Sequence, residues 1–495
     1  MVALLWLAAA SPLSAQQREL FTVSELTVRG RVLDAFAARD EEGRAWLAAI
    51  SAEGMPPDER RFLTLFARGE PAGAVAIPLR AAVAALDVAE IGGGRGPEVV
   101  LLEAAQLRIL DARGAPLRSV ALAPPLPLPP RTREQSRLEL VGAWSSPAAR
   151  EALLPDVAGF RLLSLAPETK ESRALALPPS AIYGEPQPGP PVRPGFFRAA
   201  LLWPAVFAVD DDGDGMRDLV ATTRYALTVY RSDANGGLSA KPSRSRRFPP
   251  FDFEEERRAD SNLMLPALAD IDGDGDGDLV VHRTVGTLMG SRAETRVHLN
   301  HGGGADPLAA PSGTLHVSGG VGTAELRDLD GDGRAELVQS VLPFGVAQLA
   351  RILVRRQAEL ELRVYGFEPE QPGVPRLRWS DEVTLPFDFK TARVTALLPK
   401  LEGDYNGDRR RDLIYGDGDG NVLLRLGRAG GQFADDAIVF PLGATGGAAL
   451  SADLDGDALD ELVYWDPVEP AGRLHVARNR GRLPGSPSRL EPRAR

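Results

Sequence analysis

Five acidic segments of this chain share one spacing of oxygen-bearing side chains, and residues 269–281 show it most fully. There, aspartates alternate mostly with glycine before an apolar run begins: Asp270, Asp272, Asp274, Asp276 and Asp278. Like charges packed this closely repel one another unless a cation lies among them, and a hard divalent cation prefers such oxygen ligands. Glycine allows the positive-φ turns that wrap a loop around an ion. The segment therefore predicts a Ca²⁺ site.

The same spacing recurs in four further segments. Their oxygen-bearing residues are Asp210, Asp212, Asp214 and Asp218; Asp328, Asp330, Asp332 and Glu336; Asp404, Asn406, Asp408 and Asp412; and Asp453, Asp455, Asp457 and Glu461. Each copy fills loop positions 1, 3, 5 and 9, and two apolar residues follow. A single copy could be an Asp/Gly-rich hairpin turn without metal. Because the register repeats, we expect about five Ca²⁺ sites.

An EF-hand is the obvious competing interpretation of these loops. Its loop also begins with alternating aspartates, but it requires a bidentate Glu at position 12 and a helix on each side. Position 12 is occupied here by Ala221, Val281, Gln339, Tyr415 and Tyr464. None of these can replace a bidentate carboxylate, and the residues after position 9 form short β-type runs. We therefore expect each loop to lead into a strand.

The composition and charge indicate a globular protein without a nucleic-acid-binding surface. The chain has 495 residues, 44% of them hydrophobic and 25% charged, which is typical of a globular protein. The formal charge of −11 is concentrated in the acidic loops, and no basic stripe marks a nucleic-acid surface. Cysteine is absent, which excludes disulfides and thiolate sites. Bound calcium is a plausible substitute for disulfides in stabilising the fold.

The chain begins with a short apolar run that ends in small residues. Residues 1–15 are typical of a secretory signal, although they lack a basic residue at the start. A buried N-terminal strand or helix, or a misplaced start, is the alternative. No later apolar stretch reaches the roughly 20 residues of a membrane span. We therefore expect an exported protein, either secreted, periplasmic or at the cell surface. The Pro- and Arg-containing tail 482–495 is predicted to be disordered.

Weaker copies of the loop precede the five acidic segments. Glu90 and Glu98 keep positions 1 and 9, and residues 143–151 keep only the last acid. First positions along the series are between 49 residues (453 − 404) and 76 residues (404 − 328) apart. This period fits one small antiparallel sheet per repeat, as in a propeller blade.

The predicted fold is all-β, a single β-propeller of about seven blades over residues 16–481, with hairpin loops that bind calcium. An eighth blade is possible if the turn and strand at residues 38–50 count as a repeat. Residues 24–194 hold the degenerate repeats and residues 200–478 the well-formed ones. Residues 20–28 alternate apolar and polar side chains as a strand does, and a closed ring could use this strand to complete its last blade. The proline-rich residues 178–194 are expected to be loop.

At these loops the chain resembles the FG-GAP/VCBS repeat family, the integrin-α-type β-propellers. The resemblance implies that side chains at positions 1, 3, 5 and 9 hold Ca²⁺ together with the backbone carbonyl at position 7. Position 7 is Met216, Asp276, Arg334, Arg410 and Leu459. Arg409 and Ala458 depart from the glycine that is usual at position 6.

Fold and metal do not determine activity. Propellers of this kind occur as adhesion and scaffold modules, and some related propellers are polysaccharide lyases. His301–Gly304 superficially matches a lipase oxyanion segment, but the chain has no G-x-S-x-G, H-E-x-x-H, P-loop or Rossmann motif. We therefore expect non-enzymatic recognition of a protein or glycan ligand. The alternative is a polysaccharide lyase or another carbohydrate-active enzyme on a calcium-stabilised propeller.

Overall fold

The computed structural model describes residue 483 and residues 20–481, with short gaps inside that range. The gaps are 56–57, 93–95, 127–136, 147–148, 157–158, 167–171, 178–203, 224–225, 234–236, 249–262, 286–291, 303–307, 319, 344–345, 389, 391–392 and 445–446. The predicted signal segment, the proline-rich residues 178–194 and the predicted tail other than Leu483 lie outside the described residues.

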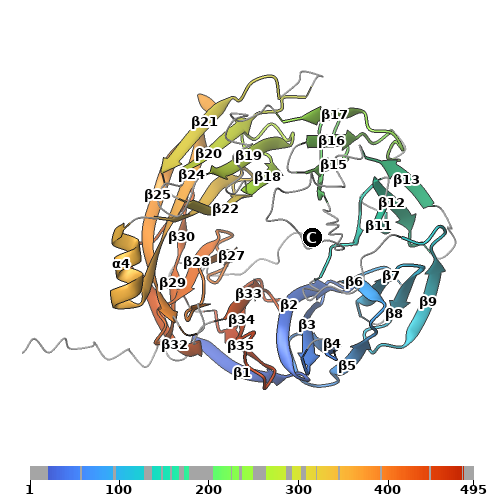
Figure 1. Cartoon of the computed structure of the whole chain (residues 1–495), viewed down its shortest axis with the longest axis horizontal. Coiled ribbons are helices and arrows are strands. Elements are labelled where there is room, and N and C mark those ends of the chain that lie inside the picture. Colours follow the sequence, from blue (N-terminus) through green and yellow to red (C-terminus); the bar gives the residue numbers. More distant parts are fainter. Residues whose placement is uncertain are drawn as a thin grey trace, which may run out of the picture.

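The described strands form eight antiparallel sheets arranged in a ring (Figure 1). We number these blades in chain order, with the innermost strand first. Blade 1 is β2 (Arg31–Arg39), β3 (Ala45–Glu53), β4 (Arg60–Ala67) and β5 (Val75–Leu79); blade 2 is β6 (Val83–Ala89), β7 (Glu98–Glu103), β8 (Gln106–Leu110) and β9 (Pro116–Ala121). Blade 3 is β10 (Val141–Gly142), β11 (Glu151–Asp156), β12 (Gly159–Ser164) and β13 (Ser172–Ala176); blade 4 is β14 (Ala205–Val209), β15 (Asp218–Thr222), β16 (Ala226–Tyr230) and β17 (Arg244–Arg247).

The other four blades continue around the ring. Blade 5 is β18 (Leu263–Ala269), β19 (Asp278–Val285), β20 (Arg292–His298) and β21 (Gly313–Ser318); blade 6 is β22 (Gly320–Arg327), β23 (Glu336–Leu342), β24 (Gln357–Glu368), β25 (Gln371–Asp388) and β26 (Arg393–Val394). Blade 7 is β27 (Lys400–Gly403), β28 (Asp412–Gly416), β29 (Gly420–Arg425) and β32 (Ile438–Ala444), beside the small pair β30 (Gly427–Arg428) and β31 (Gln432–Phe433). Blade 8 is β33 (Ala448–Ala452), β34 (Glu461–Trp465), β35 (Arg473–Asn479) and β1 (Phe21–Thr27).

The predicted all-β propeller is confirmed, and the blade count is eight rather than seven. The extra blade is the one whose β2–β3 turn lies within residues 38–50. Its strands are as apolar as those of the other blades, since β3 and β4 are almost wholly buried. The sequence obscures this blade because its turn has lost the carboxylate spacing while its strands have kept their pattern.

Ring closure joins the two ends of the described chain. Strand β1 pairs along its whole length with β35, from Phe21 opposite Asn479 to Thr27 opposite Arg473. The N-terminal strand thus supplies the outermost strand of blade 8, as predicted for residues 20–28. Figure 1 shows β1 next to β35, on the outer edge of blade 8.

The hydrophobic core is divided among the interfaces between neighbouring blades. Val280 and Val297 of blade 5 pack in one cluster with Leu337 of blade 6. The second strand of several blades is buried along its length, as in β15 and β34, because both of its faces pack against adjacent sheets. This burial explains the short apolar runs that follow position 9 of the acidic loops.

One helix with defined bounds, α4 (Val346–Arg355), lies on the outer side of blade 6 between β23 and β24 (Figure 1). Gln348 on this helix donates to the backbone carbonyl of Glu359 at 3.0 Å, which fixes the helix to β24. Among the described residues, no helix is both long enough and apolar enough to cross a membrane.

Candidate metal centres at the acidic loops

Each of the five acidic loops joins the first and second strands of its blade. In blade 5, Asp270 follows the last residue of β18 and Asp278 is the first residue of β19. The loops starting at Asp210, Asp328, Asp404 and Asp453 take the same place in blades 4, 6, 7 and 8. Since strands lie on both sides, these loops are hairpin connections and not EF-hands, as the sequence predicts.

Backbone N–H groups hold the side chains at positions 1 and 9 in fixed places. The Asp270 carboxylate accepts hydrogen bonds from Gly273 N at 2.6 Å and Gly275 N at 3.0 Å, and Asp278 accepts one from Ile271 N at 2.8 Å. The corresponding bonds occur in the other four loops, with first residues Asp210, Asp328, Asp404 and Asp453. The loops are therefore built to one plan by bonds within nine residues.

Positions 4 and 6 of every loop have positive φ. Glycine occupies both positions in the first three acidic loops, but the fourth and fifth loops carry Arg409 (φ 68°) and Ala458 (φ 74°) at position 6. A residue with a Cβ is strained in this conformation. The two departures from the usual glycine thus leave the loop path unchanged at a cost in conformational energy.

Four of the five loops bring three carboxylates close together. The trios are Asp210, Asp212 and Asp218; Asp270, Asp272 and Asp278; Asp328, Asp330 and Asp332; and Asp453, Asp455 and Glu461, each with one oxygen per residue within 4.8 Å of the others. In the fourth loop an amide takes part in place of a carboxylate. There, Asn406 Oδ1 accepts from Asp408 N at 3.2 Å, as the position 3 aspartates of three other loops do.

The position 5 residues Asp214, Asp274, Asp408 and Asp457 lie in the same loops but outside these trios, where each accepts a hydrogen bond from the N–H of position 7. The Asp276 side chain lies toward the preceding blade. A Cβ on Gly302 would lie 3.0 Å from its Oδ2, and one on Gly213 of the blade 4 loop would lie 3.4 Å from its Oδ1. Asp276 is thus placed between two loops.

Burial raises the pKa of every position 9 carboxyl, and the other carboxylates of the same loop add to the effect. The pKa rises to about 6 for Asp218, to about 7 for Asp278 and Glu336, and to about 8 for Asp412 and Glu461. Buried negative charge is costly unless a cation compensates it. The electrostatics of these loops therefore favour a bound cation.

Two buried oxygen atoms supply a direct test of whether a cation fits. Glu461 is fully buried, and its Oε1 has no hydrogen-bond partner among the described residues. Asp212 Oδ1 in the blade 4 loop is likewise buried without a hydrogen-bond partner, while Oδ2 of the same carboxylate lies 3.0 Å from Arg231 Nη1. Buried polar atoms normally have partners, so each orphaned oxygen indicates a missing one. Oxygen-rich loops of this kind fit a hard divalent cation such as Ca²⁺.

The loops of blades 4 to 8 are joined to one another by backbone hydrogen bonds. The N–H of position 8 donates to a carbonyl at position 1 or 2 of the preceding blade's loop: Gly277 N to Asp210 O at 2.9 Å, Ala335 N to Asp270 O at 2.8 Å, Arg411 N to Leu329 O at 2.7 Å and Asp460 N to Asp404 O at 2.9 Å. The five loops thus form one continuous row along the ring.

In blades 1 and 2, an arginine donates directly to the acid that follows the first strand of the blade. In blade 1, Asp40 accepts from Arg44 Nε at 2.8 Å within the β2–β3 turn. In blade 2, Glu90 accepts from Arg150 Nε at 2.8 Å, across the boundary with blade 3. Glu98 still accepts from Ile91 N at 2.9 Å, as position 9 does elsewhere. In these two degenerate loops, the positive charge beside the acid is therefore an arginine guanidinium of the chain itself.

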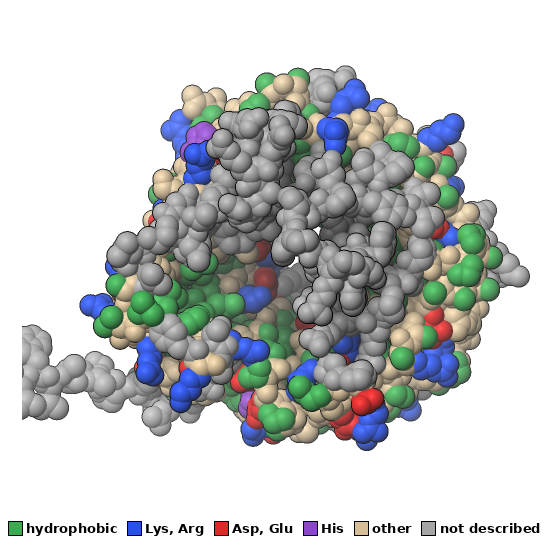
Figure 2. Space-filling model, in the orientation of Figure 1, with side chains coloured by type: hydrophobic (Ala, Val, Ile, Leu, Met, Phe, Trp, Pro, Cys, Tyr) green, Lys and Arg blue, Asp and Glu red, His purple; other side chains and the backbone are tan. Residues whose placement is uncertain are grey.

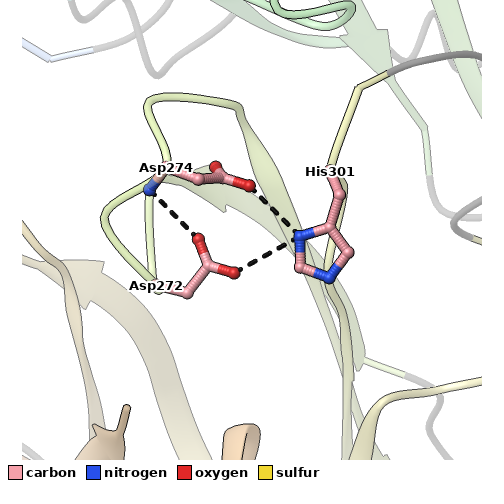
Figure 3. Close-up of side chains that lie close together, drawn as sticks. All are labelled: Asp272, Asp274 and His301. Carbon is pink, nitrogen blue, oxygen red and sulfur yellow. Dashed lines mark hydrogen bonds and ion pairs between the residues drawn. The ribbon is translucent and has the colours of Figure 1, made fainter.

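Sequence reasoning missed these arginines and also His301. The imidazole of His301 lies beside Asp272 and Asp274, whereas the sequence suggests only a turn residue there (Figure 3). Arg44 could have been found from the sequence, because it is a basic residue close in sequence to a loop that lacks the acidic spacing. His301 gives no such signal, because 27 residues separate it from Asp274.

Comparisons with protein-family models and with solved structures gave matches. A family model described as FG-GAP-like repeat matches residues 210–281, which hold the first two acidic loops. The chain is similar to a solved Agrocybe aegerita lectin recognising non-reducing terminal N-acetylglucosamine (12% identity, 94% of this chain and 96% of that chain covered, TM-score 0.39) and to the Neurospora crassa Pan2 WD40 domain (8% identity, 92% and 90% covered, TM-score 0.30).

The comparison with curated proteins gave no significant match. The matched residues 210–281 run from the acidic loop after β14 in blade 4 into β19 of blade 5, and the acidic loop recurs in register in blades 6, 7 and 8. The chain is therefore an eight-bladed β-propeller in which residues 210–281 match an FG-GAP-like repeat.

Proposed function

We propose that this protein is an exported, calcium-binding β-propeller that acts as a non-enzymatic recognition, adhesion or scaffold module for a protein or glycan ligand. Calcium is structural in this proposal. The observation that carries it is the row of five acidic loops on consecutive blades, joined by backbone hydrogen bonds and containing buried carboxylate oxygens without partners. The residues that would hold Ca²⁺ are those at positions 1, 3, 5 and 9.

The ion would supply compensating charge and would not act on a substrate. Each loop lies at a hairpin inside a blade, and its position 9 side chain is buried, as for Asp278 and Asp412. Binding only to the folded state adds about 1.4 kcal/mol per site when free Ca²⁺ is roughly tenfold above the dissociation constant. Five such sites matter against a typical stability of about 5–15 kcal/mol.

Charged side chains of both signs lie close together on the inner strands of blades 6 and 7. Arg327 lies 3.1 Å from Glu325 and 3.9 Å from Glu402, and Lys400 lies 3.8 Å from Glu402. On the face in Figure 2, basic, acidic and apolar side chains are interspersed around the ring. This mixture supports a protein or glycan ligand over nucleic acid.

The first experiment measures how many Ca²⁺ ions the protein binds and how they change its melting temperature. The purified chain is stripped with a chelator and titrated with Ca²⁺ by calorimetry, and the melting temperature is recorded before and after. We expect about five ions per chain and a melting temperature that falls on chelation and recovers with Ca²⁺. An unchanged melting temperature together with no bound calcium would refute the metal part of the proposal.

The second experiment separates recognition from catalysis. The calcium-loaded protein is applied to arrays of glycans and extracellular proteins, and in parallel it is incubated with acidic polysaccharides while ultraviolet absorbance is followed. We expect calcium-dependent binding without unsaturated product. Product that disappears on chelation would instead establish the lyase alternative.

A further inference from the structure

The acidic loop of blade 5 has a histidine beside it, and the equivalent positions of the other four blades hold other residue types. In each of these blades, the second and third strands pair in the same register, so equivalent positions can be counted three residues beyond the aligned residue of the third strand. The aligned pairs are Leu219–Tyr230, Leu279–His298, Leu337–Tyr365, Leu413–Arg425 and Leu462–Ala477. The residue reached is Asp233, His301, Glu368, Arg428 and Arg480, respectively.

Only blade 5 thus offers a nitrogen ligand in this place among these five loops. His301 Nδ1 lies 3.1 Å from Asp274 Oδ2 and 3.5 Å from Asp272 Oδ2. Figure 3 shows the imidazole next to both carboxylates, reaching the hairpin from a different segment of the blade. The three side chains form a compact group of one nitrogen and two oxygen ligands.

The neighbours of His301 in the sequence fix its position. Asn300 is buried; its backbone N donates to Asp278 at 2.8 Å and its Nδ2 donates to Asp211 O of blade 4 at 2.9 Å. Gly302 has φ +60°, and a Cβ there would lie 2.9 Å from Asp212 O. The backbone on both sides of His301 therefore lies against the row of loops, while the imidazole itself is 64% exposed and is placed by its contacts with Asp272 and Asp274.

We propose that the blade 5 loop is a mixed nitrogen–oxygen site that takes Zn²⁺ in preference to Ca²⁺, with His301, Asp272 and Asp274 as ligands. Imidazole suits Zn²⁺, whereas Ca²⁺ takes oxygen ligands. Two ligands of a tetrahedral ion with bonds of about 2.0–2.1 Å are roughly 3.3 Å apart. The observed separations of 3.1 Å and 3.5 Å fall on either side of that value. The other four loops keep oxygen ligands and Ca²⁺.

This inference rests on the proposed ion-binding role of the loops, and its test separates the two. The full-length chain is stripped with a chelator, dialysed into millimolar Ca²⁺ and titrated with Zn²⁺ against a chromophoric competitor, and bound metal is counted by mass spectrometry. We expect one Zn²⁺ per chain to remain bound in excess Ca²⁺. The variant His301→Ala should weaken this site on the order of tenfold to a hundredfold or more.

Two matched variants control the experiment. Arg428→Ala changes the equivalent position of blade 7, and His316→Ala removes another exposed histidine of blade 5. Both should keep the zinc site. Zinc retained by His301→Ala at full affinity, or zinc displaced from the wild type by Ca²⁺ while about five Ca²⁺ bind, would overturn this inference alone. A chain that binds neither ion would overturn the proposed function as well.

Discussion

At the scale of single residues, the loops tolerate a strained backbone at position 6. Arg409 (φ 68°) and Ala458 (φ 74°) have positive φ, as do the glycines that occupy this position in the other acidic loops. The bonds from position 1 and position 9 fix the path of the loop, so the residue at position 6 has to follow it. A single substitution that removes this strain should therefore increase the free energy of unfolding.

We predict that Arg409→Gly stabilises the protein by about 1 kcal/mol, because glycine adopts positive φ without the clash of a Cβ. Urea unfolding in saturating Ca²⁺ measures the effect. The reciprocal variant is Gly333→Ala, whose Cβ would enter open space at φ +91° and should cost a similar amount from conformation alone. Arg410→Gly, at a residue without positive φ, should not stabilise. Stabilisation by Arg410→Gly as large as that by Arg409→Gly would refute the explanation.

The position 9 carboxyls predict how stability depends on pH in the absence of an ion. Burial raises the pKa of Asp412 from 3.8 to about 8, so the folded chain binds this proton more tightly than the unfolded chain. Its contribution is therefore fully present below about pH 4 and is lost as the pH rises toward 8. We expect the melting temperature of chelated protein to fall between roughly pH 6 and pH 8.

The variant Asp412→Asn should show a smaller fall over the same range, because the amide does not ionise. Calcium should also remove most of the fall in the wild type, since the ion stabilises the charged carboxylate. Thermal melts across this pH range, with and without chelator, provide the measurement. A wild-type fall that the variant reproduces in full would show that other groups cause it.

At the scale of elements, the same hairpin carries two different sets of charged side chains. Blades 4 to 8 have acidic loops, while in the β2–β3 turn of blade 1 the Arg44 guanidinium donates to Asp40. Asp40 is buried and also accepts from Trp46 Nε1 at 3.0 Å. The two kinds of blade should therefore respond differently to calcium.

We predict that Asp40→Ala destabilises the protein by about 1–3 kcal/mol, because Arg44 and Trp46 lose their acceptor. The loss should be equal in calcium and in chelator. By contrast, Asp455→Ala in blade 8 should be costly in calcium and nearly neutral in chelator. Paired urea titrations of the two variants make this comparison. A calcium-dependent effect of Asp40→Ala would mean that blade 1 also binds an ion.

At the scale of the whole molecule, the ring depends on β1, which is far in sequence from its partner β35. Leu26 on β1 is fully buried in the cluster between blade 8 and blade 1, whereas Val23 on the same strand is 42% exposed. The hydrophobic contribution of β1 to ring closure therefore comes from its buried side chains, such as Leu26, and not from exposed ones such as Val23.

We predict that Leu26→Ala costs about 2–5 kcal/mol through the cavity it leaves, while the control Val23→Ala changes stability little. Urea unfolding provides the free energies, and limited proteolysis reports whether blade 8 opens first. Equal and small effects of the two substitutions would show that the β1–β35 pairing does not hold the ring closed.

The sequence by itself determined the five acidic loops, the strands that flank them and the role of residues 20–28. These features depend on contacts within a few residues, such as the bonds from Gly273 N and Gly275 N to Asp270, or on the alternation of apolar side chains. Calcium binding and export remain predictions. The eighth blade was only an alternative because its turn lacks the acidic spacing.

Only the tertiary structure decided which residues from other segments meet the loops. His301 reaches Asp274 across 27 residues of sequence, and Arg150 reaches Glu90 across 60. Such contacts depend on the register of the third strand and on the packing of one blade against the next, and no local pattern encodes either. The count of eight blades has the same origin, because the long-range pairing of β1 with β35 closes the ring.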